Sequence, residues 1–150
     1  MAEHLATVEW TSDGDFLAGR YSRAHSWRFD GGTVVPASAS PANVPEAFAD
    51  PAGVDPEEAL IASVSSCHML WFLHLAREAG LDVAAYRDEA SGTLGRGADG
   101  RIGFTRITLR PKLDFAGAAP AADALDRLHH EAHERCFIAN SLKAEVVVEG

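Results

Sequence analysis

The stretch "DPEEALIASVSSCHMLWFLHLAREAG", residues 55–80, carries the signals of a long helix. Asp55 is a suitable N-cap, Pro56 fits the first helical position, and Glu58 is placed to complete a capping box with Asp55. Gly80 marks the expected end. From Leu60 onward apolar residues occupy every side, which predicts a central helix enclosed by other elements.

The segments on either side of this helix favour strands. Residues 5–11 and 19–29 alternate apolar and polar side chains around the turn "SDGD", and residues 82–94 and 101–113 flank the hairpin sequence "GRGADGR". Residues 36–56 contain five prolines and are predicted to form a long surface connection.

The last third of the chain predicts one more helix and one more strand. The helix is expected from Pro120 to about Cys136, and "LKAEVVVE", residues 142–149, is expected to close the chain as a strand. The order is then ββ-α-ββ-α-β. This is an α+β fold in which two central helices are supported by antiparallel sheet.

Length and charge restrict the class of protein. A chain of 150 residues with 47% hydrophobic residues predicts one compact domain over residues 1–150. Its net charge of −9 argues against nucleic acid or an anionic membrane as a partner, because an acidic surface repels phosphates. A small molecule or another protein is the expected partner.

The sequence favours a cytoplasmic protein. Residues 1–10 include Glu3, His4 and Glu9 where a signal peptide would need an apolar segment. Residues 59–76 are nearly apolar but contain three serines and two histidines, which argues for a buried helix instead of a membrane span.

Cys67 and Cys136 are the two cysteines of the chain. At 100° per residue, Cys67 shares a helix face with Leu70, Trp71 and His74, and Cys136 shares the inward face of the second predicted helix. Both thiols are therefore expected to point inward. They are either inert core residues or, if the helices bring them together, a chemically used pair.

A pair of thiols in an apolar pocket suits one reaction in particular. One thiol can attack an oxidant with a hydrophobic body, such as an organic hydroperoxide, and the other can resolve the product. Burial raises the pKa of a thiol, so a cation must stabilise the thiolate. The candidate cations are Arg20, Arg23, Arg28, His68, His74, His129 and His133.

Two motifs together resemble the OsmC/Ohr family of osmotically induced and organic hydroperoxide resistance proteins. They are "DPEEALIASVSSCHM" around Cys67 and "CFIANSLK" beginning at Cys136. The resemblance covers the whole order of elements and implies an intertwined homodimer with two active sites at its interface. It also implies an antioxidant peroxidase of the oxidative stress response that uses cysteine and no cofactor.

The resemblance assigns roles to four residues. Cys67 would be the peroxidatic thiol and Cys136 the resolving thiol, and the two would form a disulfide reduced by a dithiol donor, such as a lipoyl protein. Glu57 and an arginine would lie over the reactive sulfur. Arg23 fits best as that arginine, with Arg20 as the alternative.

The spacing of Glu57 and Cys67 supports a dimer. Ten residues correspond to about 15 Å along an unbroken helix, so the two side chains cannot touch within it. The glutamate then reaches the thiol of the other subunit, unless the helix start is bent. His68 and Phe137 depart from the family pattern, which usually has an aromatic or small residue and a proline there.

Two other functions remain open from the sequence. The same fold can bind a small hydrophobic ligand at a dimer interface without catalysis. Alternatively, His129, His133 and Cys136 lie on one side of the second predicted helix and have the donor atoms of a zinc site.

Overall fold

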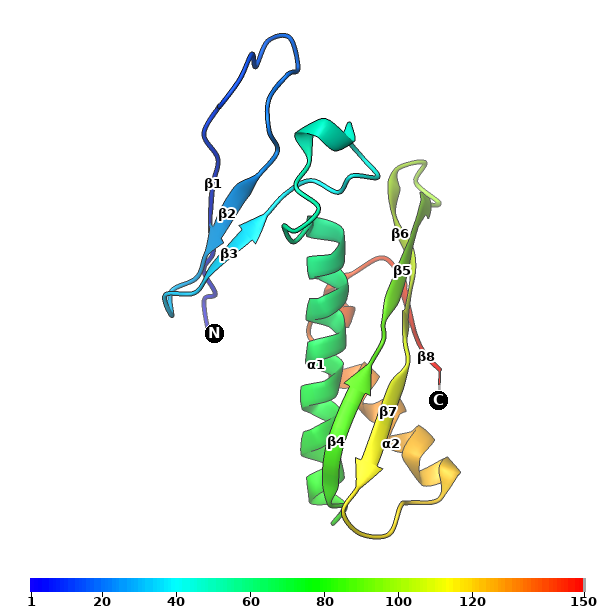
Figure 1. The fold of residues 1–150 in the computed structure, drawn as a ribbon. Coiled ribbons are helices and arrows are strands. Elements are labelled where there is room, and N and C mark those ends of the chain that lie inside the picture. Colours follow the sequence, from blue (N-terminus) through cyan, green and yellow to red (C-terminus); the bar gives the residue numbers. More distant parts are fainter. Residues whose placement is uncertain (150) are drawn as a thin grey trace. The chain divides into compact units, whose positions relative to one another are not determined.

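The computed structural model describes residues 1–149, and the chain divides into two compact units at Leu60/Ile61 (Figure 1). The division falls within helix α1 (Pro56–Glu78) and not in a linker. The α+β class with two helices is confirmed. That residues 1–150 form a single domain stays a prediction.

The N-terminal unit contains a three-stranded antiparallel sheet in the order β1-β2-β3. Its strands are β1 (Thr7–Glu9), β2 (His25–Arg28) and β3 (Val34–Ala37), followed by the short 3-10 helix η1 (Glu46–Phe48). The first two strands are shorter than predicted, because Asp15 and Arg20 close a tight turn with two backbone hydrogen bonds of 2.9 and 3.0 Å. The intervening loop carries a cluster of Trp10, Phe16 and Tyr21.

Strand β3 was not predicted, since Pro36 and the prolines that follow it suggested a connection. Pro36 is tolerated because β3 is an edge strand of the sheet, where one side of the backbone needs no hydrogen-bond donor. The predicted surface connection over residues 36–56 therefore begins inside a strand, and η1 interrupts it.

Helix α1 has the predicted ends. The Asp55 N–H donates to Glu58 Oε1 and the Glu58 N–H donates to Asp55 Oδ1, each at 2.8 Å, which completes the capping box. At the other end Gly80 has a φ of 79°, and the Leu81 N–H donates to the Ala76 carbonyl at 2.9 Å. This pattern is a Schellman motif, and it is the reason the helix stops before Gly80.

The C-terminal unit continues from α1 with five strands and two further helices. In chain order these are β4 (Val83–Asp88), β5 (Ser91–Arg96), β6 (Ile102–Leu109), β7 (Pro111–Phe115), α2 (Ala122–Arg135), the 3-10 helix η2 (Ala139–Ser141) and β8 (Glu145–Val148). They form a two-stranded sheet, β4-β7, and a three-stranded sheet, β5-β6-β8. Strand β8 is parallel to β6, so the sheet is not wholly antiparallel as predicted.

The two strands predicted over residues 82–94 and 101–113 are each broken once, and the breaks lie opposite each other. Asp88 pairs with Pro111 on one side of the break, and Ser91 pairs with Thr108 on the other. The Asp88 carboxylate accepts the Arg110 N–H at 2.6 Å and the Ser65 hydroxyl. The Asp88 side chain therefore supplies hydrogen bonds at the level where the pairing of both strands is interrupted.

Helix α1 packs on both sheets of this unit through one face. Phe72, Leu75 and Ala76 form a core with Ala132 of α2, and Val64 packs with Ile107 and Leu109 of β6. The other side is open, and Leu70 is 60% exposed. The prediction that α1 is enclosed on every side is therefore wrong for the single chain.

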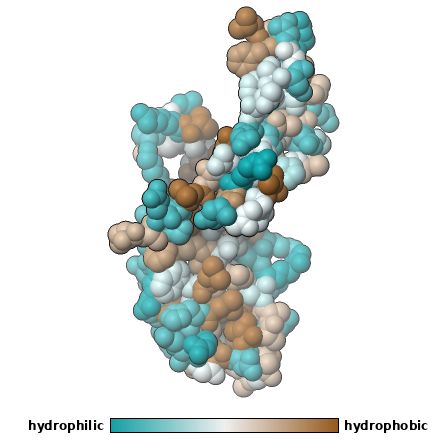
Figure 2. Space-filling model, turned by 90° about the vertical axis from the view of Figure 1, so that its left-hand side faces the viewer, coloured by the Kyte–Doolittle hydropathy of each residue, from teal (hydrophilic) through white to brown (hydrophobic). Residues whose placement is uncertain are grey.

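The exposed side of α1 leaves apolar area at the surface. Figure 2 shows hydrophobic side chains grouped in the lower part of the molecule, among hydrophilic ones. Among the described residues, α1 is the one helix that is long and apolar enough to cross a membrane by length and composition alone. Its buried stripe and its capped ends are the features of a core helix with one uncovered face.

Candidate functional site

Cys67 and Cys136 meet in the C-terminal unit. Cys67 lies in the middle of α1 and is half-buried, whereas Cys136 directly follows α2 and is fully buried. Both are free thiols, and they lie close enough for Cys67 to raise the pKa of the Cys136 thiol. The inward direction predicted for both cysteines therefore brings them into contact across the two helices.

The environment of Cys136 keeps its proton in place. Burial, first of all, and then the hydrogen bond and charge of Cys67 raise the pKa of the Cys136 thiol to about 11. The N–H of Ala139 donates to Cys136 Sγ at 3.4 Å and works in the opposite direction. At neutral pH Cys136 is therefore a thiol and not a thiolate.

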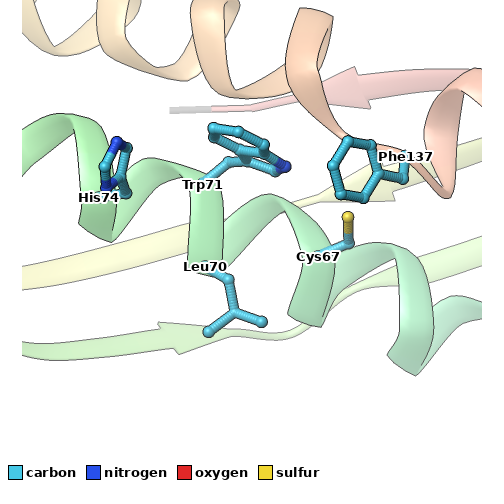
Figure 3. A pocket seen from close by; sticks show the side chains of 5 residues that line it. All are labelled: Cys67, Leu70, Trp71, His74 and Phe137. Atoms are coloured by element: carbon cyan, nitrogen blue, oxygen red, sulfur yellow. The ribbon is translucent and has the colours of Figure 1, made fainter. Parts of the chain in front are cut away.

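A cavity of about 350 Å³ opens beside Cys67. Its lining is apolar and aromatic apart from one histidine, and consists of Cys67, Leu70, Trp71, His74 and Phe137. Figure 3 shows the Cys67 sulfur directed toward the ring of Phe137, with Trp71 beside it. A cavity of this size and lining accommodates a small hydrophobic molecule against the sulfur atom.

Trp71 connects the cavity to the segment that carries Cys136. Its ring makes an edge contact with Phe137 at 5.6 Å between centroids, and the guanidinium of Arg135 lies 5.6 Å above it. Arg135 and Phe137 are the two neighbours of Cys136 in the chain. Trp71 therefore holds the segment of the second thiol to the helix of the first.

Two buried histidines pair next to the thiols. His68 Nε2 and His129 Nδ1 are 3.0 Å apart, and both rings are buried. Burial lowers the pKa of both, that of His68 to about 4 with further lowering by His129 and His133. Both are thus neutral at physiological pH, so neither is the cation that the sequence offered for stabilising the thiolate.

Arg23 and Glu57 belong to the N-terminal unit. The Arg23 guanidinium donates to the Tyr21 and Gly19 carbonyls and stacks 3.6 Å above the Tyr21 ring. Glu57 accepts a hydrogen bond from Asn43 at 3.0 Å through Oε1, while its Oε2 is buried and has no partner within the described chain.

The other candidate arginines of this unit are paired with carboxylates. Arg20 binds Asp15 at 3.2 Å and Arg28 lies 3.6 Å from Glu9, both at the surface. Arg23 is in no such ion pair among residues 1–149. Of the three arginines considered from the sequence, Arg23 is therefore the one whose charge is free for another ligand.

The donor atoms proposed for zinc do not converge. His129 Nδ1 is engaged by His68, and Cys136 contacts Cys67. Over the described residues, no group of three or more His, Cys, Asp or Glu side chains is placed to hold a metal ion. The zinc hypothesis for His129, His133 and Cys136 has no support in this geometry.

Two features of the site were missed from the sequence. Phe137 was noted only as a departure from a family pattern, although its position after Cys136 places it over Cys67. The hydrogen bond between His68 and His129 joins residues 61 positions apart and depends on how the helices cross. The available signal was the presence of histidines on both thiol-bearing helices.

Comparison with known proteins identifies the family of this chain. The family model described as OsmC-like protein matches residues 49–149. A solved OsmC-like protein of unknown function from Vibrio cholerae is 47% identical, with 99% of each chain covered and a TM-score of 0.96. No curated protein matches the sequence.

Two more distant structures share the fold. The organic hydroperoxide resistance protein OhrB of Bacillus subtilis is 21% identical over 97% of this chain and 96% of its own, with a TM-score of 0.67. An organic hydroperoxide resistance protein from Legionella pneumophila is 14% identical over 100% and 98%, with a TM-score of 0.70. At these identities the similarity establishes the architecture alone.

Proposed function

Because this chain belongs to the OsmC-like protein family, we propose that it is a cysteine-based peroxidase that reduces organic hydroperoxides. The observation that carries the proposal is the contact of Cys67 and Cys136 on the wall of an apolar cavity. An inert pair of core cysteines would not need an open cavity beside one of the sulfur atoms. The reducing cytoplasm is the proposed location, where both thiols stay free between turnovers.

In the first step the Cys67 thiolate attacks the terminal oxygen of the hydroperoxide. A sulfur–oxygen bond forms and the O–O bond breaks, which gives a sulfenic acid on Cys67 and an alkoxide that takes up a proton to become the alcohol. The cavity walls hold the hydrophobic body of the substrate. The Cys136 thiol lies beside Cys67, so the resolving group is in place before the oxidant arrives.

In the second step Cys136 attacks the sulfenic sulfur. A disulfide forms between Cys67 and Cys136, and the hydroxyl of the sulfenic acid leaves as water with the proton of Cys136. The Ala139 N–H at 3.4 Å from Cys136 Sγ stabilises the negative charge that develops on this sulfur. A dithiol donor, such as a dihydrolipoyl protein, then reduces the disulfide.

We assign Arg23 and Glu57 to the active site of a homodimer. Glu57 and Cys67 are ten residues apart on one unbroken helix, about 15 Å at 1.5 Å per residue. The glutamate therefore serves the Cys67 of a second copy. The unpartnered Glu57 Oε2 and the unpaired charge of Arg23 support this role, since an arginine bonded to both carboxylate and sulfur would stabilise the thiolate.

The test is peroxide consumption in the presence of a dithiol. The wild-type protein should consume cumene hydroperoxide rapidly, Cys67→Ser should consume none above background, and Cys136→Ser should react once and then accumulate sulfinic acid. Ser66→Ala, next to Cys67 on the exposed side of the helix, is the matched control. Equal turnover in Cys67→Ser and the wild type would refute the proposal.

A binding function is the second candidate, favoured by the same cavity of about 350 Å³. In that case the protein would bind a small hydrophobic ligand without reacting with peroxide. Native mass spectrometry of the purified protein separates the two functions. A copurified ligand together with slow reaction of Cys67 would favour binding.

A further inference from the structure

The buried pair of His68 and His129 has no role in the steps above. His68 is 1% exposed and His129 is 6% exposed, and one hydrogen bond of 3.0 Å joins His68 Nε2 to His129 Nδ1. The ring of His129 also stacks on Phe72, with the centroids 4.3 Å apart. The pair therefore joins α1 to α2 both by ring packing and by a hydrogen bond, which is directional.

This hydrogen bond lies close to the thiols. His68 is the next residue after Cys67 on α1, and His129 lies two turns before Cys136 on α2. Helix α2 leads directly into Cys136, so any shift of α2 along α1 moves the second sulfur relative to the first. The bond is thus well placed to set the separation of the two sulfur atoms.

The buried histidine pair also costs free energy that an apolar core would not. Nδ1 of His68 is buried and has no partner within residues 1–149. Two apolar rings would occupy the same space without an unpartnered nitrogen, and burying such a group costs free energy. A directional bond gives what apolar packing does not, namely one preferred alignment of the helices.

We propose that the hydrogen bond between His68 and His129 positions Cys136 against Cys67 for disulfide formation. The two histidines are positioning residues, since they act through the placement of the helices. This positioning role deepens the proposed function and rests on one part of it, the disulfide between Cys67 and Cys136. It does not depend on which oxidant forms the disulfide. It is therefore testable without a peroxide.

The experiment measures the equilibrium between the dithiol and disulfide forms in glutathione redox buffers, with the full chain. His129→Phe keeps the stacking on Phe72 and removes the bond, whereas His129→Asn keeps a polar amide near the position of Nδ1. The double variant His68→Phe/His129→Phe removes the bond and leaves no unpartnered nitrogen. His130→Asn, on the exposed side of the same helix, is the control.

Loss of the bond should shift the equilibrium of His129→Phe toward the dithiol by about tenfold, the factor expected for one hydrogen bond. The double variant should show the same shift, and His129→Asn should recover most of the wild-type constant. A double variant that forms the disulfide as readily as the wild type would overturn the inference. If His129→Phe does not fold, the redox equilibria of the double variant and of His129→Asn test the positioning role.

Two oxidants separate a failure of the positioning role from a failure of the proposed peroxidase function. Suppose that diamide, a general thiol oxidant, produces the disulfide in the wild type but cumene hydroperoxide does not. The peroxidase proposal then fails, while the effect of the histidine variants on the disulfide still tests the positioning role. A wild type that gives no disulfide with either oxidant overturns both.

Discussion

At the scale of single residues, the two thiols differ by environment and not by chemistry. Cys136 is fully buried and its pKa is raised to about 11, whereas Cys67 lies at a cavity. The accessible sulfur is therefore the one that meets a substrate first, and the buried one keeps its proton until a sulfenic acid is present. This asymmetry supports the order of attack and resolution proposed above.

Phe137 should affect substrate binding and leave stability nearly unchanged. Its side chain is 69% exposed but lines the cavity beside Cys67. We expect Phe137→Ala to change the free energy of unfolding by no more than about 0.5 kcal/mol and to raise KM for cumene hydroperoxide about tenfold. The KM for the smaller tert-butyl hydroperoxide should rise less, because this molecule contacts less of the cavity wall.

Urea unfolding and steady-state kinetics check this prediction together. An equal loss with the large and the small hydroperoxide would show that Phe137 does not contact the substrate body. Phe137→Leu serves as a conservative comparison, because it keeps an apolar group at the same position.

The side-chain directions that the sequence predicted correctly were those set by helix periodicity. Cys67 and Cys136 were predicted to face inward from spacing alone, and they do. Phe137 over the sulfur and the bond between His68 and His129 depend on how α2 approaches α1. Such contacts are set by tertiary packing, which no window of one helix contains.

At the scale of elements, the start of α1 should contribute measurably to stability. Asp55 and Glu58 exchange two hydrogen bonds of 2.8 Å at the first turn. Replacing Asp55 by Ala removes the cap of a helix on which both cores depend, and should lower the free energy of unfolding by about 1 kcal/mol. Asp114→Ala on β7, which has an exposed side chain, is the control for loss of a carboxylate.

Urea denaturation of the two variants measures the difference. A loss in Asp114→Ala as large as that in Asp55→Ala would mean that net charge, and not the capping box, accounts for the change.

The buried histidines should make the packing of α1 on α2 sensitive to acid. The pKa of His68 is about 4 when folded, below its ordinary value of 6.5, so the unfolded chain binds the proton more tightly. Stability is then complete above about pH 6.5 and falls as the pH decreases toward 4. For His68 this amounts to about 3 kcal/mol.

Other ionisable groups surround the pair and act on it in both directions. His133 on α2 lowers the pKa of His68, whereas Asp88 on β4 raises it, and Asp126 and Asp88 raise that of His129. Chemical denaturation at pH 7 and pH 4.5 measures the loss of stability. The double variant His68→Phe/His129→Phe should lose less on acidification than the wild type, and an equal loss would assign the effect to carboxylates.

The strands show which features of the elements could not be predicted from the sequence. The helix α1 was placed within two residues because its caps are local, but the strands over residues 82–94 and 101–113 were predicted unbroken. At these breaks Asp88 binds Arg110 and Ser65, which are 22 and 23 positions away in the chain. A side chain that replaces a strand partner leaves no trace in the alternation of apolar residues.

At the scale of the whole molecule, both units leave apolar side chains in water. In the N-terminal unit these include Leu5, Val8 and Leu17, and in the C-terminal unit Leu70, Ile102 and Phe137. Leu70 and Phe137 lie together on the cavity wall beside α1, and grouped apolar surface of this kind is typical of an interaction site. We therefore expect the chain to associate with a second copy, which would cover the open face of α1.

Sedimentation velocity should give a single species with twice the mass of the chain at micromolar concentration. Leu70→Asp places a charge on the open face of α1 and should shift the protein toward monomer. Asp126→Lys on α2 alters charge at an exposed position and is the control. A monomeric wild type with full activity would contradict the assignment of Arg23 and Glu57 to a second copy's thiol.

The most direct test of the account is the product formed when the reduced protein meets one equivalent of cumene hydroperoxide. Peptide mapping by mass spectrometry under non-reducing conditions should identify one disulfide, between Cys67 and Cys136, and one equivalent of alcohol. Recovery of both cysteines as free thiols, with the hydroperoxide unconsumed, would contradict it.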